Sequence, residues 1–99
     1  MKILWLEQAR GDLRDIRNFI AKRNPNAAKE LAAHIRRARD QIKAHPEMQS
    51  EGDIPGTREL VVRKFSCVLV YRLTSSHAEI VWVFGPGQDR VEGARRDPR

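Results

Sequence analysis

The sequence has few residues of the kinds that covalent or metal-dependent chemistry requires. Its 99 residues include a single cysteine, Cys67, which excludes an internal disulfide and a cysteine-rich zinc site. The three histidines, His34, His45 and His77, do not have the spacing of a metal-ligand pair. We therefore expect no metal and no cofactor, and we expect Cys67 to be a buried, unreactive thiol in a strand.

Long hydrophobic runs are also missing. No apolar stretch is longer than Cys67 to Tyr71, which is far shorter than the roughly 20 residues of a membrane-spanning helix. The apolar stretch at the N-terminus is too short for a signal peptide. These absences predict a cytoplasmic protein.

Acidic residues are outnumbered by basic ones. Nineteen Lys and Arg against 13 Asp and Glu give a net charge of +6, and the pI is about 10.2. This excess suits a polyanionic partner, either a nucleic acid or an acidic protein, although a solvated basic surface explains it equally well. A hydrophobic fraction of 40% is ordinary for a globular chain. We expect one domain over residues 1–90 and a flexible tail over residues 91–99.

The first half of the chain has the period of two helices. A short apolar stretch, Lys2 to Leu6, predicts a strand. Helical spacing follows at Ala9, Leu13, Ile16 and Ile20, with Phe19 beside this stripe and Arg10, Arg14 and Arg17 on the other side. Asn24 is suited to cap the N-terminus of a second helix, and Pro25 is suited to the first position of that helix. A second apolar seam comprises Ala28, Leu31, Ile35, Ala38 and Ile42. The pattern predicts a helical hairpin, with Arg36, Arg37, Arg39 and Lys43 off the seam in solvent.

The second half has three strand-like segments, Thr57 to Val62, Ser66 to Leu73 and Ala78 to Phe84, and a turn at Thr74 to His77 joins the last two. Alternation places Cys67, Leu69, Tyr71 and Leu73 on one face, and Ser66, Val68, Val70 and Arg72 on the other. In the last strand, Ile80, Trp82 and Phe84 oppose Val81 and Val83. We assign Trp5 and Trp82 to the core. The helices can cover only one face, so the other apolar face is expected to be exposed to a partner.

Four cations, Arg58, Arg63, Lys64 and Arg72, interrupt the apolar strands and allow three interpretations. They could stabilise phosphate charge in a metal-free RNA-cleaving site, bind a partner, or act as surface charge. An RNA-cleaving site also needs an acid and a base. Tyr71 points away from Arg72 by alternation, and His77 lies in the predicted turn. For Arg58, a pair with Glu59 or another acid across the sheet is an alternative to binding.

The order and spacing of several motifs resemble the RelE/ParE toxin superfamily of bacterial type II toxin–antitoxin modules. The motifs are ARGDLRDIRNFIAKRNPNAAKEL at Ala9 to Leu31, HPEM at His45 to Met48, GTRELVV and CVLVYRL within Gly56 to Leu73, and EIVWVFGPGQDR at Glu79 to Arg90. The resemblance implies an α+β fold with an N-terminal strand, a helical hairpin and a three-stranded antiparallel meander. It also implies a cognate antitoxin that binds the helices and the sheet through an amphipathic helix and an extended segment.

The segments NPNAA, GTRELVV and VLVYRL resemble ParE sequences more than RelE sequences. ParE members poison DNA gyrase, whereas RelE members cleave mRNA on the ribosome. Many relatives carry a histidine where this chain has Gly85, and the chain has no tyrosine near its C-terminus. The resemblance therefore implies a ParE-like toxin that binds the gyrase–DNA complex rather than an enzyme. The alternatives are a RelE-like mRNA interferase and an inactive member that only binds partners.

Two sets of residues are candidates for these contacts. The first set is expected to contact the target: Arg58, Arg63, Lys64, Arg72, Gln88 and Arg90. The second set is expected to contact the antitoxin: Leu13, Ile16, Phe19, Ile20, Val68 and Val70. Since the toxin is basic, we expect an acidic, ParD-like antitoxin and a hetero-oligomer with it.

Overall fold

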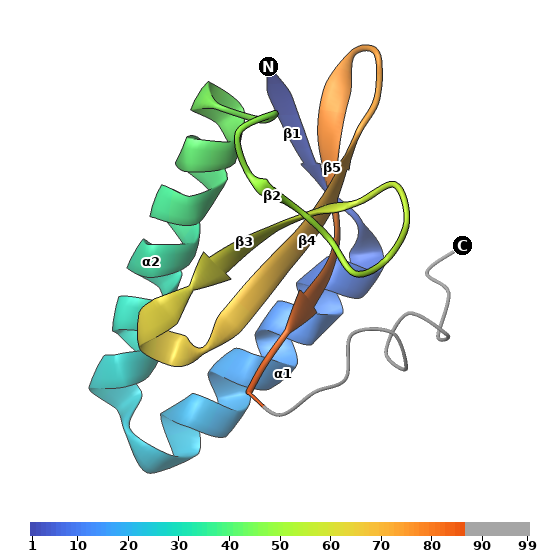
Figure 1. Ribbon diagram of the computed structural model, residues 1–99. Coiled ribbons are helices and arrows are strands. Elements are labelled where there is room, and N and C mark those ends of the chain that lie inside the picture. The colour runs from blue at the N-terminus through green and yellow to red at the C-terminus, as the bar shows by residue number, and fades with distance from the viewer. Residues whose placement is uncertain (87–99) are drawn as a thin grey trace.

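The computed structural model describes residues 1–86; the predicted tail, Gln88 and Arg90 lie outside this range. The chain order is β1 (Lys2–Trp5), α1 (Glu7–Arg23), α2 (Pro25–Ala44), β2 (Ser50–Glu51), β3 (Arg58–Val62), a 3-10 turn η1 (Arg63–Phe65), β4 (Cys67–Leu73) and β5 (His77–Phe84). The two helices form a hairpin that lies against one face of the sheet (Figure 1).

The sheet has five strands in the order β1-β5-β4-β3-β2. The first strand pairs with β5 in parallel, and the remaining pairs are antiparallel, so the expected meander is confirmed within a mixed sheet. The two-residue strand β2 was not predicted. Strand β4 begins at Cys67 rather than Ser66, because Ser66 ends η1 with φ 51°. His77 was predicted in the turn, which is wrong, because it is the first residue of β5.

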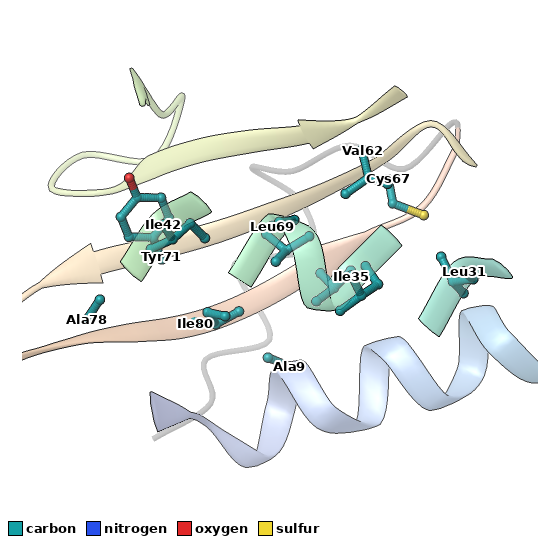
Figure 2. Packing of buried hydrophobic residues seen from close by; sticks show 12 residues of the cluster. Ala9, Leu31, Ile35, Ile42, Val62, Cys67, Leu69, Tyr71, Ala78 and Ile80 are labelled. Atoms are coloured by element: carbon teal, nitrogen blue, oxygen red, sulfur yellow. The ribbon is translucent and has the colours of Figure 1, made fainter. Parts of the chain in front are cut away.

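The main core lies between the helical hairpin and the sheet. Figure 2 shows Ala9 of α1 and Ile35 of α2 facing the strand residues Leu69, Tyr71 and Ile80. All five residues of the predicted α2 seam are buried, which confirms that seam. Cys67 is fully buried as expected, and burial raises the pKa of its thiol.

Two polar side chains connect the helices to their surroundings. The Asn24 side chain accepts a hydrogen bond of 3.1 Å from the Ala27 amide, so the predicted cap of α2 is confirmed. On α1, Asp12 accepts a hydrogen bond of 3.1 Å from the Val83 amide of β5. Strand β1 pairs with β5 only as far as Trp5, opposite Ile80, so β1 offers no partner to the Val83 amide. The Asp12 carboxylate accepts the hydrogen bond of this amide instead.

A second, smaller cluster covers the opposite face of the sheet, and two predictions fail there. The register shifts between Val70, opposite Trp82, and Tyr71, opposite Ile80, so Val81 is an extra residue in β5. Trp82 therefore packs on this second face while Ile80 packs under the helices, and the prediction that they share a face is wrong. Trp82 is nevertheless core, as predicted.

The second face was also expected to be exposed at Val68 and Val70, and this is wrong. Their exposed fractions are 8% and 0%. Leu6, which follows β1, and Ile54, from the loop between β2 and β3, pack against the cluster that contains them. Among the described residues, no helix is both long and apolar enough to cross a bilayer.

Candidate functional site

A groove with a volume of about 390 Å³ lies between α1 and α2 and extends to β1. Its floor is apolar and consists of Trp5, Leu13, Leu31, Ala32 and Ile35. Its rims are basic and consist of Arg10, Arg14 and Arg17 from α1 and of Arg36 and Arg39 from α2. The groove therefore combines an apolar strip with two rows of guanidinium groups.

Helical spacing produces these rows. Arg10, Arg14 and Arg17 are separated by four and three residues, so they project from one side of α1. Arg36 and Arg39 are three residues apart and project from the facing side of α2. The tight connection at Asn24 keeps the two helices adjacent. Arginine stems can cover apolar surface while their charged ends stay in water, which explains how the rims border the floor.

The charge of the groove is largely uncompensated. Arg39 Nη2 lies 3.0 Å from Asp40 Oδ1, which pairs this one rim residue. Within residues 1–86, Arg10, Arg14, Arg17 and Arg36 form no ion pair. Glu7 lines a neighbouring hollow together with Trp5, Arg10 and Arg14, and it is not among the residues that line the groove. Unpaired guanidinium groups around an apolar floor favour a partner that carries carboxylates on either side of an apolar stripe.

The four cations predicted as target contacts in the strand region do not converge on one site. Arg58 Nη1 donates hydrogen bonds of 3.0 Å to the carbonyl oxygens of Glu47 and Gln49, and these bonds hold the segment after α2. Its partner across the ladder is Tyr71, which faces the helices. Arg72 follows Tyr71 and therefore points to the opposite face. Arg58 and Arg72 thus lie on different sides of the sheet.

Arg72 belongs to a polar cluster beside the turn that joins β4 and β5. Its Nε donates a hydrogen bond of 2.6 Å to Glu79 Oε1. The His77 Nε2 atom lies 3.0 Å from Glu79 Oε2, and its Nδ1 atom lies 2.9 Å from the Ser76 hydroxyl. The hydrogen bond with His77, and then the one from Arg72, lower the pKa of Glu79 below its ordinary value of 4.5.

The remaining pair, Arg63 and Lys64, lies in η1. Lys64 forms a salt bridge with Glu30 of α2, and Lys64 lowers the pKa of this carboxyl. Arg63 is exposed and forms no ion pair with the described residues. Both cations border a second cleft that also contains His34. The structure therefore brings together two of the four predicted cations, with one histidine beside them.

Tyr71 was the chain's only tyrosine candidate for proton transfer. Its side chain is fully buried, as alternation predicted, and its hydroxyl donates a hydrogen bond of 2.5 Å to the Pro46 carbonyl oxygen. Burial raises the pKa of Tyr71 to about 12, and Arg58 lowers it by a smaller amount. A buried phenol with this pKa is a structural group and is poorly suited to acid–base work near neutral pH.

The predicted antitoxin contacts fall in different environments. Leu13 lines the groove. Ile16 and Ile20 pack against the main core and are half-buried. Phe19 is 58% exposed, and the Arg23 guanidinium lies 4.5 Å from the centre of its ring. The sequence pattern placed Arg36 and Arg39 in solvent, and it placed the α1 rim arginines on the side of the helix away from the apolar stripe, so the groove was not predicted. The signal available was their helical spacing, combined with the short turn that places the two helices side by side.

A family model describing the ParE toxin of the type II toxin–antitoxin system parDE matches residues 3–90. The chain belongs to the ParE toxin family. A Sinorhizobium fredii protein named "Putative toxin Y4kP" is 33% identical over an alignment of 88 positions, and the alignment covers 82% of this chain and 92% of that protein. A solved structure described as the chromosomal ParDE system of P. aeruginosa has a TM-score of 0.71 at 19% identity, and the alignment covers 86% of this chain and 95% of that one.

These comparisons confirm the resemblance to ParE and the α+β fold. The chain is thus a toxin of a ParDE type II toxin–antitoxin system, and such a system implies a ParD antitoxin as partner.

Proposed function

We propose that this ParE toxin acts by binding and poisoning DNA gyrase. The proposal rests on the contacts that the predicted cations and Tyr71 make within the fold. Arg58, Lys64 and Arg72 are engaged within the fold, and the only tyrosine is buried with a pKa of about 12. The described residues thus offer better surfaces for binding than for acid–base catalysis.

Target contact remains proposed for the six residues named from the sequence. Of the four in the described range, Arg63 is the one that can contact a target without giving up an ion pair or hydrogen bond. Arg58 would have to release two carbonyl oxygens, and Arg72 would have to release Glu79. We therefore expect Arg63→Ala to weaken target inhibition more than Arg72→Ala does.

The experiment is a supercoiling reaction with purified toxin, gyrase, ATP and relaxed plasmid. Inhibition together with protein-linked linear DNA is the expected result. A toxin that stops growth but leaves gyrase unaffected would refute the gyrase assignment. Transcript cleavage on ribosomes would then be measured with Arg63→Ala and His34→Ala, because these residues border the same cleft.

We further propose that the antitoxin neutralises the toxin by seating an acidic amphipathic helix in the groove between α1 and α2. The apolar face of this helix would cover Leu13, Leu31 and Ile35. Its flanking carboxylates would pair with the rim arginines, four of which form no ion pair among the described residues. Charge-assisted, bidentate arginine–carboxylate pairs suit this arrangement.

Escape from neutralisation tests this second proposal. Arg14→Glu reverses one charge in the middle of the α1 rim, and Lys22→Glu reverses one at the end of α1, outside the groove lining. Both variants are expressed with and without the antitoxin, and growth is measured. Arg14→Glu should stop growth even with antitoxin present, while Lys22→Glu should still be neutralised. Equal neutralisation of both variants would place the antitoxin elsewhere.

A further inference from the structure

Three hydrogen-bonded side chains lie beside the turn that joins β4 and β5. The Ser76 hydroxyl lies 2.9 Å from His77 Nδ1, and His77 Nε2 lies 3.0 Å from Glu79 Oε2. Arg72 Nε donates a hydrogen bond of 2.6 Å to the other carboxylate oxygen of Glu79. The turn lies at the end of the sheet beside the N-terminus, where Lys2 pairs with His77 (Figure 1). A hydroxyl next to an imidazole that a third group orients is the arrangement that activates a serine nucleophile.

The hydrogen-bond partners of His77 decide which ring nitrogen carries a hydrogen. The hydrogen bonds from His77 and Arg72 lower the pKa of Glu79, so its carboxylate is ionised near neutral pH and can only accept. His77 Nε2 therefore carries a hydrogen. The Thr74 hydroxyl lies 3.1 Å from Nδ1, but it donates its one hydrogen to the His77 carbonyl oxygen. Ser76 thus has the hydroxyl hydrogen that the neutral imidazole accepts at Nδ1, which gives this nitrogen the position of a base.

We propose that Ser76 is an acylation site that takes a small acyl group from an activated ester or thioester. The Ser76 Oγ atom attacks the acyl carbonyl carbon, and its proton moves to His77 Nδ1. A bond forms between Oγ and this carbon, and the bond from the carbon to the leaving oxygen or sulfur breaks. The proton then passes from His77 to the leaving group. Glu79 is a positioning residue, because it holds the imidazole and does not touch the acyl donor.

The surroundings of Ser76 restrict the acyl donor. Ser76 is exposed and lines none of the hollows described above, so these hollows cannot hold a long acyl chain for it. An oxyanion that forms in water gains little stabilisation from the protein, so the reaction requires a good leaving group. Amides and phosphodiesters lack one, which separates this site from RNA cleavage. The proposal goes beyond the proposed function, because acylation requires neither gyrase nor antitoxin, and the two can fail independently.

The test is incubation of the purified full chain with p-nitrophenyl acetate near neutral pH, followed by an acid quench and peptide mapping by mass spectrometry. The acetyl group should be found on Ser76. Ser75 is the matched control, because it is exposed in the same turn while the hydroxyls within reach of Nδ1 are those of Thr74 and Ser76. Ser76→Ala should abolish labelling of this turn, and Ser75→Ala should retain it. Thermal unfolding of both variants checks that the fold is intact.

The His77→Gln variant tests whether activation, rather than exposure, directs the label. Glutamine keeps a neutral hydrogen-bonding side chain but is not a base, so labelling of Ser76 should slow about 100-fold. Labelling of the wild type should also slow in acid as the imidazole takes a proton, and His77→Gln should lack this step. The charged groups around the imidazole in the sheet are Glu79, Arg72 and, on β1, Lys2.

Three results would overturn the proposal. The first is equal labelling rates at Ser75 and Ser76. The second is an acetyl group confined to lysines and the N-terminal amine. The third is an unchanged rate of Ser76 labelling in His77→Gln, because the imidazole would then not act as a base.

Discussion

Tyr71 should make the stability of this toxin sensitive to alkali. Its phenol is fully buried, and its pKa rises from 10.0 to about 12 in the folded chain. A phenol whose pKa is raised by folding contributes stability that is present below pH 10 and is lost as the pH rises through about 12. At about 1.4 kcal/mol per unit, this shift amounts to about 3 kcal/mol.

Two measurements check this magnitude. Tyr71 is the only tyrosine, so the ultraviolet absorbance of ionised phenol reports this residue alone. The folded chain should titrate well above pH 10 and the chain in denaturant near pH 10. Urea unfolding at a series of pH values should show wild-type stability falling between pH 10 and 12.

The Tyr71→Phe variant supplies the control. It loses the hydrogen bond to the Pro46 carbonyl and should be less stable near neutral pH by about 1 kcal/mol. It keeps the lysines, which also titrate in alkali, but it lacks the phenol. The reasoning would be refuted if the stability of wild type and variant declined in parallel above pH 10. A titration midpoint near pH 10 for the Tyr71 phenol in the folded chain would also refute it.

Three further changes test the packing of the helices and strands. Asp12→Ala leaves a buried strand amide without its acceptor and should lower the free energy of unfolding in urea by about 1–3 kcal/mol, whereas exposed Asp15→Ala should have little effect. Asn24→Ala removes the cap of α2 and should lower the free energy of unfolding by about 1 kcal/mol, which thermal unfolding would measure. The lowered pKa of Glu79 contributes stability above about pH 4.5 that is lost as the pH falls through the folded value, so Glu79→Gln should flatten the acid side of the stability profile.

The elements of the fold could be predicted because they depend on local periodicity. The apolar seam of α2, the cap at Asn24 and the inward direction of Tyr71 follow from spacing and alternation, and all were confirmed. Alternation failed in β5, where the extra residue Val81 moves Trp82 to the face opposite Ile80. A one-residue bulge has no signature in the apolar pattern, because both faces of β5 are apolar.

The site was less predictable because its geometry depends on residues far apart in the sequence. Lys64 meets Glu30 across 34 positions, and Arg58 meets the Glu47 carbonyl across 11. Nothing within the strands identifies these partners. The arginine rims of the groove have regular spacing on each helix, but they become one surface only when α1 and α2 pack side by side.

The most direct test of the account measures two competing lesions in the same culture after a brief induction of the toxin. DNA breaks covalently linked to gyrase and the integrity of ribosome-bound transcripts are followed together. We predict that gyrase-linked breaks accumulate as growth stops while transcripts stay intact. Cleaved transcripts without gyrase-linked breaks would contradict the account and would identify the chain as a ribonuclease on the ParE fold.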